Sequence, residues 1–287
     1  MTGQNENIGP ESCDHVCSNC SLRDCHERRS PQSITSDDQS NITHVIGIVS
    51  GKGGVGKSLV TSLIASKLRR YGYAVGILDA DITGPSIPKI FGVRENLEAD
   101  DTGIIPAQTK SGIKMVSVNL LLPDEDTPVA WRGPLVNNII RQFWSETHWG
   151  NLDYLLVDMP PGTSDVFLTV FQTLPAESII TVSTPQDLVS MIVGKAVNLA
   201  DEMNVPVVGL VENMAYFVCP NCHERHAIFG KSQGARVAEK YGIPVHVELP
   251  LRPDFAELCD NGAVERCDVE DALDPLIAAI TKLDKGQ

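Results

Sequence analysis

Apolar runs of strand length alternate with segments of helical periodicity along the chain from His44 onward. The strongest runs are almost wholly apolar, which is typical of strands buried on both faces of a parallel sheet. We predict strands at residues 44–50, 74–79, 104–105, 115–118, 154–158, 179–183, 207–211 and 245–247. Helices are predicted after residue 58 and at 134–144, 166–174, 187–203, 231–241 and 270–284. This repeated order predicts one α/β domain, residues 44–287, with a mostly parallel sheet covered by helices on both faces.

A glycine-rich segment joins the first predicted strand to the first predicted helix. It fits the phosphate-binding pattern G-x-x-x-x-G-K-[ST] and consists of Gly51, Lys52, Gly53, Gly54, Val55, Gly56, Lys57 and Ser58. In this strand–loop–helix order, backbone N–H groups and a helix N-terminus face a polyphosphate. The expected ligand is ATP with Mg²⁺: Lys57 reaches the β- and γ-phosphates, and the Ser58 hydroxyl takes a Mg²⁺ position. The segment therefore predicts a P-loop NTPase.

Aspartates follow two other predicted strands, at the edge of the sheet where ligands bind. Asp158 ends an apolar strand and precedes a segment rich in Pro and Gly, as a Walker B aspartate precedes a switch loop. A carboxylate there can hold Mg²⁺ directly or through water. Asp81 is placed to orient the attacking water, and Asp79 is an alternative member of the metal shell. The predicted catalytic residues are Lys52, Lys57, Asp81 and Asp158.

The first 43 residues differ in composition from the rest, because they are polar and contain hardly any aliphatic side chains. Such a segment cannot offset the entropy of ordering itself and is predicted to be a flexible tail. Its cysteines follow the pattern C-x3-C-x2-C-x4-C and are Cys13, Cys17, Cys20 and Cys25. Four thiolates can surround an iron–sulfur cluster or a zinc ion, and His15 or His26 could replace one of them. The tail alone does not separate these two metals, and inert thiols are a third interpretation.

The net charge and the apolar segments of the chain limit which partners and which cellular location we expect. The chain has 23 Lys and Arg against 37 Asp and Glu, a net charge of −14, which disfavours nonspecific binding to nucleic acid or anionic membranes. We find no apolar N-terminal segment of signal-peptide type and no apolar run long enough to span a bilayer. A cytoplasmic location is therefore expected, where thiols stay reduced and eight cysteines need a role other than disulfides.

A second cysteine group, Cys219 and Cys222, follows the strand predicted at 207–211 and a turn predicted at 212–214. With His223 and His226 it could form a zinc knuckle. The alternative is an iron–sulfur cluster shared by two chains, and it follows from the number of ligands that a cluster needs. One pair supplies two thiolates, a cubane cluster takes four, and a two-fold dimer brings two pairs together.

The motifs together resemble the Mrp/ApbC-type iron–sulfur cluster carriers, which belong to the MinD/ParA-like class of P-loop ATPases. The resemblance covers about residues 44–265 and is carried by G-K-G-G-V-G-K-S, D-A-D-I-T-G-P-S, W-R-G-P (131–134), D-M-P-P-G-T-S-D (158–165), S-T-P-Q (183–186) and E-N-M…C-P-N-C…F-G. It implies that Lys52 reaches the partner's nucleotide across a homodimer and that Asn213 takes part in adenine recognition. It also implies that Cys219 and Cys222 bridge a [4Fe–4S] cluster between two chains.

Two cysteine groups depart from that family pattern. Relatives with a four-cysteine tail have a longer first spacer than the three residues found here. Cys259 and Cys267 match no family ligand and are predicted to be buried structural thiols.

The function that the resemblance implies is an ATP-hydrolysing scaffold that receives a [4Fe–4S] cluster from donors and passes it to apoproteins. One alternative is a positioning ATPase of MinD or ParA type, which would require a basic amphipathic helix or patch. The acidic C-terminal segment 268–280 counts against it. Another alternative is an ATP-dependent electron donor resembling the nitrogenase iron protein, whose ligating cysteines are well separated in sequence, unlike Cys219 and Cys222.

Overall fold

The structure of the chain is a computed structural model. It describes residues 40–81, 84, 86–121, 133–162, 165–186 and 189–282. Within these residues, no helix is both long enough and apolar enough to cross a bilayer.

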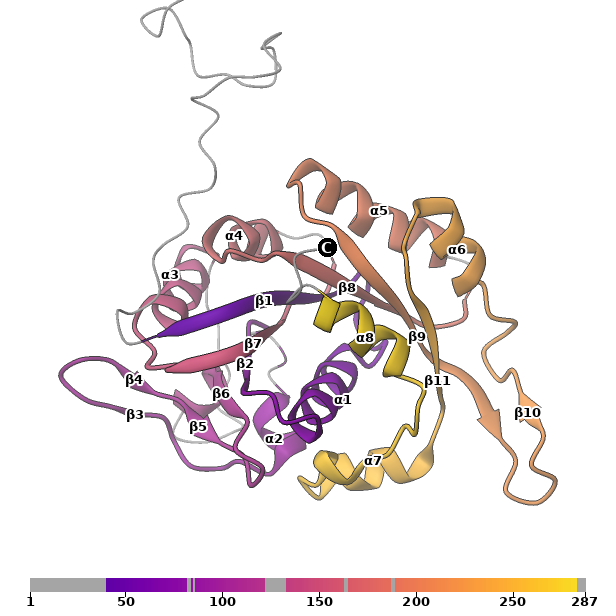
Figure 1. Cartoon of the computed structure of the whole chain (residues 1–287), viewed down its shortest axis with the longest axis horizontal. Coiled ribbons are helices and arrows are strands. Elements are labelled where there is room, and N and C mark those ends of the chain that lie inside the picture. The colour runs from indigo at the N-terminus through magenta and orange to yellow at the C-terminus, as the bar shows by residue number, and fades with distance from the viewer. Residues whose placement is uncertain are drawn as a thin grey trace, which may run out of the picture. The chain divides into compact units, whose positions relative to one another are not determined.

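A nine-stranded sheet forms the centre of the domain, in the order β10-β9-β8-β1-β7-β2-β6-β5, with β11 also paired to β9 (Figure 1). The parallel strands are β1 Asn41–Ser50, β2 Val75–Asp79, β6 Lys114–Ser117, β7 Asn151–Asp158, β8 Ser178–Ser183, β9 Val207–Val218 and β11 His246–Pro250. The short strands β5 Ala107–Gln108 and β10 Arg225–His226 are antiparallel to their neighbours. A separate two-stranded sheet pairs β3 Glu98–Ala99 with β4 Ile104–Ile105. The predicted α/β fold with a mostly parallel sheet is confirmed.

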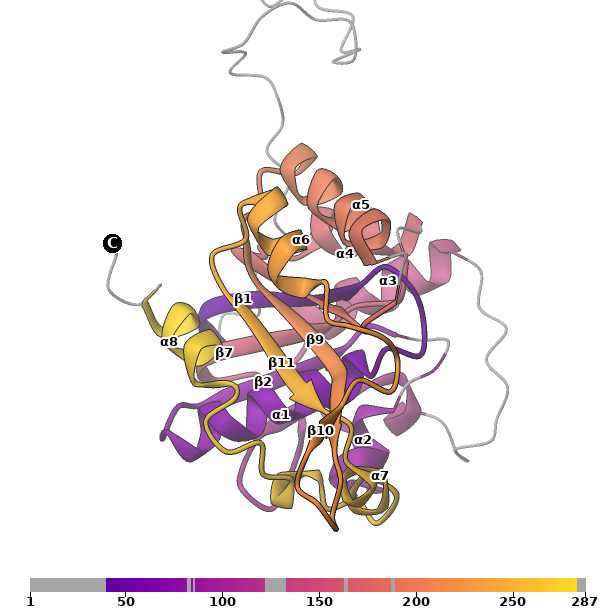
Figure 2. The ribbon, with the colours of Figure 1, turned by 90° about the vertical axis from the view of Figure 1, so that its right-hand side faces the viewer.

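Helices cover both faces of the sheet (Figures 1 and 2). One face carries α1 Lys57–Arg70, α2 Ile87–Phe91, α7 Pro253–Asp260 and α8 Asp274–Lys282. The other carries α3 Gly133–Ser145, α4 Asp165–Thr173, α5 Val189–Glu202 and α6 Gly234–Tyr241. Two short 3₁₀ helices lie at Val118–Leu121 and Val264–Arg266.

Alternate side chains of β1 pack into two hydrophobic cores, one on each face of the sheet. Ile46 and Ile48 are fully buried against the α1 side, whereas Val45 and Val49 are buried against the α3–α5 side. Successive side chains of a strand point to opposite faces, so a strand with helices on both sides has to be apolar at nearly every position. This explains the continuous apolar runs in the sequence.

The prediction of a turn at residues 212–214 is wrong, because β9 continues through this segment to Val218. Met214 adopts a positive φ of 57°, and the register between β9 and β11 shifts between Glu248 and Pro250. The strand thus absorbs an irregularity and continues beyond it. As a result, β9 leads directly to Cys219.

Candidate functional site

The P-loop connects β1 to α1 at the carboxyl edge of the sheet. Gly54 and Gly56 have φ values of 77° and 80°, a conformation that side-chain-bearing residues rarely adopt. Helix α1 begins at Lys57 with no acidic residue in its first turn and no side-chain cap. No acidic side chain of the helix's own first turn therefore competes for its first N–H groups or for the positive end of its dipole.

Asp158, at the end of β7, contacts the start of α1 through both carboxylate oxygens. Ser58 Oγ donates to Oδ2 over 2.6 Å, and Thr61 Oγ1 donates to Oδ1 over 2.7 Å. Lys57 Nζ lies 2.8 Å from Asp158 Oδ2. Asp158 is fully buried, so this carboxylate is held in place by an ion pair and two hydroxyl groups.

Asp79 and Asp81 lie beside this group at the end of β2. Asp79 is in register with Asp158 on the neighbouring strand, and it accepts a 3.0 Å hydrogen bond from Ser117 Oγ. Burial, followed by the nearby charge of Asp158, raises the pKa of Asp79 to about 8. Asp81 Oδ2 lies 3.7 Å from Lys57 Nζ. The three carboxyl groups therefore form one coupled cluster around Lys57.

Lys52, near the start of the P-loop, donates a hydrogen bond to the side chain of Gln186. Gln186 follows β8, so the structure brings the S-T-P-Q segment to the P-loop. The sequence alone indicates no role for Gln186. Gln186 lies three residues beyond the end of β8, at the same edge of the sheet as Asp158 at the end of β7, and this position after an apolar strand is the signal in the sequence that indicates its place at this edge.

Asn213 in β9 is 2% exposed, and its side chain contacts the P-loop. Its Nδ2 donates to the Val55 carbonyl oxygen over 2.9 Å. A Cβ added at Gly56 would lie 2.3 Å from the same nitrogen. The amide group and the glycine therefore fit each other closely, and only glycine leaves room for the contact.

A cleft of about 460 Å³ opens over the P-loop. This volume is within the usual range for small-molecule sites. Besides the P-loop, its walls include Asp81, Asn213, Arg252, Phe255 and Cys259.

Cys259 and Cys267 lie together beside this cleft. Cys267 is buried, as predicted, but Cys259 is partly exposed and lines the cleft. A hydrogen bond from the Cys267 thiol lowers the pKa of Cys259, and the same contact, with burial, raises the pKa of Cys267. The prediction of two buried thiols is therefore wrong for Cys259.

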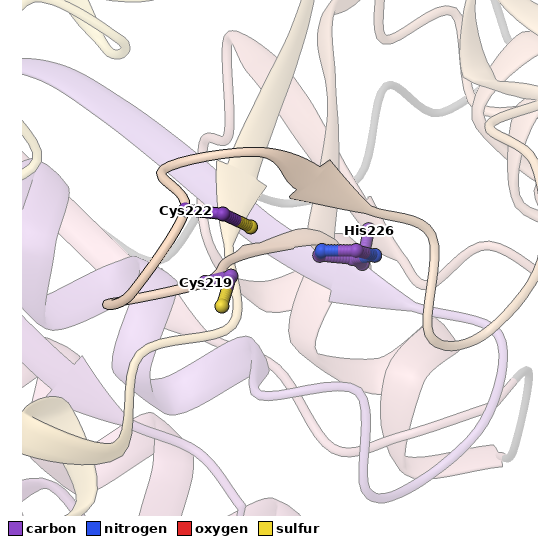
Figure 3. Close-up of side chains that lie close together, drawn as sticks. All are labelled: Cys219, Cys222 and His226. Atoms are coloured by element: carbon purple, nitrogen blue, oxygen red, sulfur yellow. The ribbon is translucent and has the colours of Figure 1, made fainter.

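The second candidate site is a hairpin at the end of β9. Cys219 and Cys222 lie in its turn, and β10 returns antiparallel to β9 (Figure 3). Backbone N–H groups of Cys222 and Asn221 donate to the Cys219 sulfur, which lowers the pKa of that thiol. His226 lies with the two cysteines, and the donor atoms of all three are within 4.8 Å of one another. His223 is not part of this group.

The surroundings of the cysteine pair are open and partly apolar. Cys222 is exposed and Cys219 is half-buried. Val218, Ile228 and Phe229 are 40%, 55% and 41% exposed. Large apolar side chains left in solvent around a site are typical of a surface that another molecule covers.

Some predicted site residues fall outside the described part of the chain. These are the tail cysteines Cys13, Cys17, Cys20 and Cys25, and the motif residues at positions 82, 83, 85, 131–132 and 163–164.

A family comparison decides the class of protein. The family described as "ParA: NUBPL iron-transfer P-loop NTPase" matches residues 41–282, from the start of β1 to the end of α8. The chain belongs to this family. The predicted resemblance to P-loop iron–sulfur cluster carriers is confirmed.

Individual relatives agree with the family. An iron–sulfur cluster carrier protein of Clostridium perfringens (strain 13 / Type A) is 49% identical over 245 residues, covering 83% of this chain and 86% of that protein. The cytosolic Fe-S cluster assembly factor CFD1 of Candida glabrata is 40% identical over 240 residues, covering 81% and 84%. A solved nucleotide-binding protein of Archaeoglobus fulgidus, in complex with ADP and with Co, has a TM-score of 0.72. It is 44% identical, and the match covers 78% of this chain and 88% of that one.

Proposed function

We propose that this protein binds and hydrolyses ATP, assembles a [4Fe–4S] cluster between the Cys219–Cys222 pairs of two chains, and transfers it to apoproteins. The observation that carries the proposal is the course of β9. One strand contains Asn213, which holds the P-loop, and leads into a cysteine pair with a preformed hydrogen-bonded turn. Nucleotide and cluster sites are therefore connected through a single element of the main chain.

The nucleotide part of the proposal rests on the P-loop geometry. Lys57 is the proposed ligand of the β- and γ-phosphates, and backbone N–H groups of Gly51–Ser58 are the proposed cradle. Lys57 has to exchange its ion pair with Asp158 for the phosphates, which leaves the Asp158 carboxylate free to face a cation. Asn213 lines the cleft, where an amide can recognise the base.

The donor set at Ser58 and Asp158 fits Mg²⁺. Both residues offer oxygen atoms, and these atoms already lie 2.6 Å apart. Mg²⁺ prefers one or two such protein oxygens together with the phosphates of its nucleotide. The ion would neutralise charge on the transferred phosphoryl group. Asp81 is the proposed residue that orients the attacking water, and Lys52 is the proposed contact to the partner's nucleotide.

The cluster part of the proposal rests on the hairpin. Cys219 and Cys222 supply half of the thiolates that a cubane takes, and the exposed apolar side chains beside them favour a second copy of the chain as the partner. Cys13, Cys17, Cys20 and Cys25 are proposed to hold a second cluster or a zinc ion within one chain.

Partners and location follow from the carrier role. Cluster donors and iron–sulfur apoproteins are the proposed protein partners, while nucleic acid and membranes are not. The cytoplasm is the proposed location, supported by the name of the cytosolic relative from Candida glabrata.

The proposal is tested by anaerobic reconstitution with iron and sulfide. The starting protein is the full chain with Cys13, Cys17, Cys20 and Cys25 replaced by Ser, so that only the hairpin site remains. We expect about four iron and four sulfide per two chains, and transfer to an apoprotein that requires a cubane. Adding Cys222→Ala should abolish both, whereas adding Cys259→Ala should abolish neither. Protein that binds no sulfide at the hairpin would rule out the carrier function.

A further inference from the structure

The cysteine hairpin is held in shape by its own backbone, without a second chain. Cys219 N donates to Glu224 O over 3.0 Å, and His223 N donates to Cys219 O over 2.9 Å. His223 takes the left-handed conformation, with φ of 58°, that lets the chain reverse. His226 then pairs with Phe217 across β10 and β9, which sets its position relative to the turn.

This geometry places three metal-binding side chains on one side of the hairpin. The two sulfur atoms and a ring nitrogen of His226 lie within 4.8 Å of one another (Figure 3). Bonds of about 2.0–2.3 Å to a tetrahedral ion put its donors about 3.3–3.8 Å apart. Cys222 and His226 are exposed, so their side chains are free to rotate over the remaining distance.

We propose that Cys219, Cys222 and His226 of a single chain bind one divalent, thiophilic cation of the Zn²⁺, Co²⁺ or Fe²⁺ class. Each ion would displace the protons of two thiols and take neutral imidazole as its third ligand. Three protein ligands leave the fourth tetrahedral position open to water, whereas a structural zinc site fills all four positions with protein ligands.

The charges near the site favour a cation. Glu224 Oε2 lies 4.0 Å from Cys222 Sγ, which adds a carboxylate to the two thiolates. The neighbouring cation, Arg225, stacks its guanidinium group 4.3 Å from the centre of the Tyr216 ring. His226 has no part in a cubane held by four thiolates, so its place beside the pair is explained by the single-ion state.

The inference rests on the proposed function in one respect: Cys219 and Cys222 also hold the [4Fe–4S] cluster when two chains form a dimer. In the single chain, the pair and His226 hold one ion. In the dimer, the two pairs hold the cluster and His226 is released. The two states exclude each other because they use the same sulfur atoms.

Cobalt titration tests the single-ion state. The protein is the full chain with the four tail cysteines replaced by Ser, kept anaerobic, free of nucleotide and monomeric by sedimentation. We expect one Co²⁺ per chain, with sulfur-to-cobalt charge transfer and the intense d–d bands of tetrahedral cobalt. His226→Ala should weaken binding at least about 10-fold, since even loss of an outer-shell partner costs that much. The matched control His223→Ala changes a histidine of the same hairpin and should bind as before.

Two results would overturn the inference: unchanged affinity and spectrum in His226→Ala, or one Co²⁺ per two chains. A second variant guards against a misfolded hairpin. His226→Cys keeps a ligand, so it should bind Co²⁺ with stronger charge transfer, and binding no tighter than in His226→Ala would also overturn the inference.

Reconstitution of the same variants with iron and sulfide separates this inference from the proposed function. His226→Ala should still form the cluster, because its four thiolates are intact. Failure of the unaltered hairpin to form a cluster, with cobalt binding as expected, would count against the carrier function alone. Cluster formation without His226-dependent cobalt binding would count against the single-ion site alone.

Discussion

Lys57 Nζ lies 2.8 Å from Asp158 Oδ2, and this ion pair is almost completely buried, with side-chain exposures of 6% and 0%. Lysine in this position is the proposed phosphate ligand, yet without nucleotide it neutralises an aspartate. The same contact therefore contributes to the stability of the protein and determines what ATP has to displace.

Lys57→Ala is expected to lower the free energy of unfolding by about 3–5 kcal/mol in the absence of nucleotide, because it leaves a buried carboxylate unpaired. ATP affinity should fall severely as well. Lys67→Ala is the matched control, since Lys67 pairs with Asp274 at the same 2.8 Å but Asp274 is 38% exposed. That variant should lose about 1 kcal/mol or less. Chemical denaturation measures both, and equal losses would contradict the role of burial.

Lys52→Ala is expected to leave folding intact and to abolish nucleotide-linked dimerisation, which sedimentation with a non-hydrolysable ATP analogue measures. Lys52 donates to Gln186 within its own chain, so a defect could also arise there. Gln186→Ala separates the two explanations. A role across the interface predicts that Gln186→Ala still dimerises, whereas an equal defect in both variants would assign Lys52 to the P-loop of its own chain.

Asn213→Ala should weaken ATP binding by about 5- to 10-fold, because the buried carbonyl of Val55 loses its donor, at a cost of about 1–1.5 kcal/mol. Asn213→Asp keeps the shape but places a second acceptor against that carbonyl, and its defect should be larger. Isothermal titration measures both. If Asn213→Asp bound ATP as tightly as the original protein, the hydrogen bond would have no part in holding the loop.

Cys259 should react with iodoacetamide at lower pH than an ordinary cysteine. Its pKa is lowered by the Cys267 thiol, so a larger fraction is thiolate at any pH below its usual value. Cys267→Ala removes that donor and should shift the rate–pH profile of Cys259 to higher pH, as followed by peptide mass spectrometry. Because Cys259 lines the cleft, ATP should slow its alkylation. An unshifted profile in Cys267→Ala would contradict the thiol–thiol contact.

The strands and the P-loop were predictable because their signals are local. A strand buried on both faces has to be apolar at nearly every position, and the Gly51–Ser58 pattern is contiguous. The segment 212–214 misled the prediction, because Glu and Asn are typical of turns when no tertiary partner is known. In the structure, Asn213 contacts Val55 and Glu212 accepts from Ser232, so both polar side chains have partners from distant parts of the chain.

Three features of the candidate sites depend on tertiary structure that the sequence pattern does not indicate. The Lys52–Gln186 bond joins residues 134 positions apart, and no spacing in the sequence indicates it. The contact of Cys259 with Cys267 depends on the turn between α7 and the following 3₁₀ helix. The choice between His223 and His226 depends on which residue of the hairpin faces the thiols, and spacing allows both.

β9 also places the proposed nucleotide site and the proposed cluster site at different points along one strand. Asn213 lies in β9 and Cys219 directly follows the strand, so the two residues are six positions apart, which corresponds to at most about 20 Å at 3.3 Å per residue. Polyphosphate oxygens are hard ligands that compete for iron, whereas the cluster depends on soft sulfur ligands. If the proposed cargo is bound at the hairpin, a triphosphate on the P-loop would lie at the other end of the segment that joins the two sites. Under this proposal, the bound nucleotide would influence the cluster through the backbone of β9 instead of through direct contact with its iron.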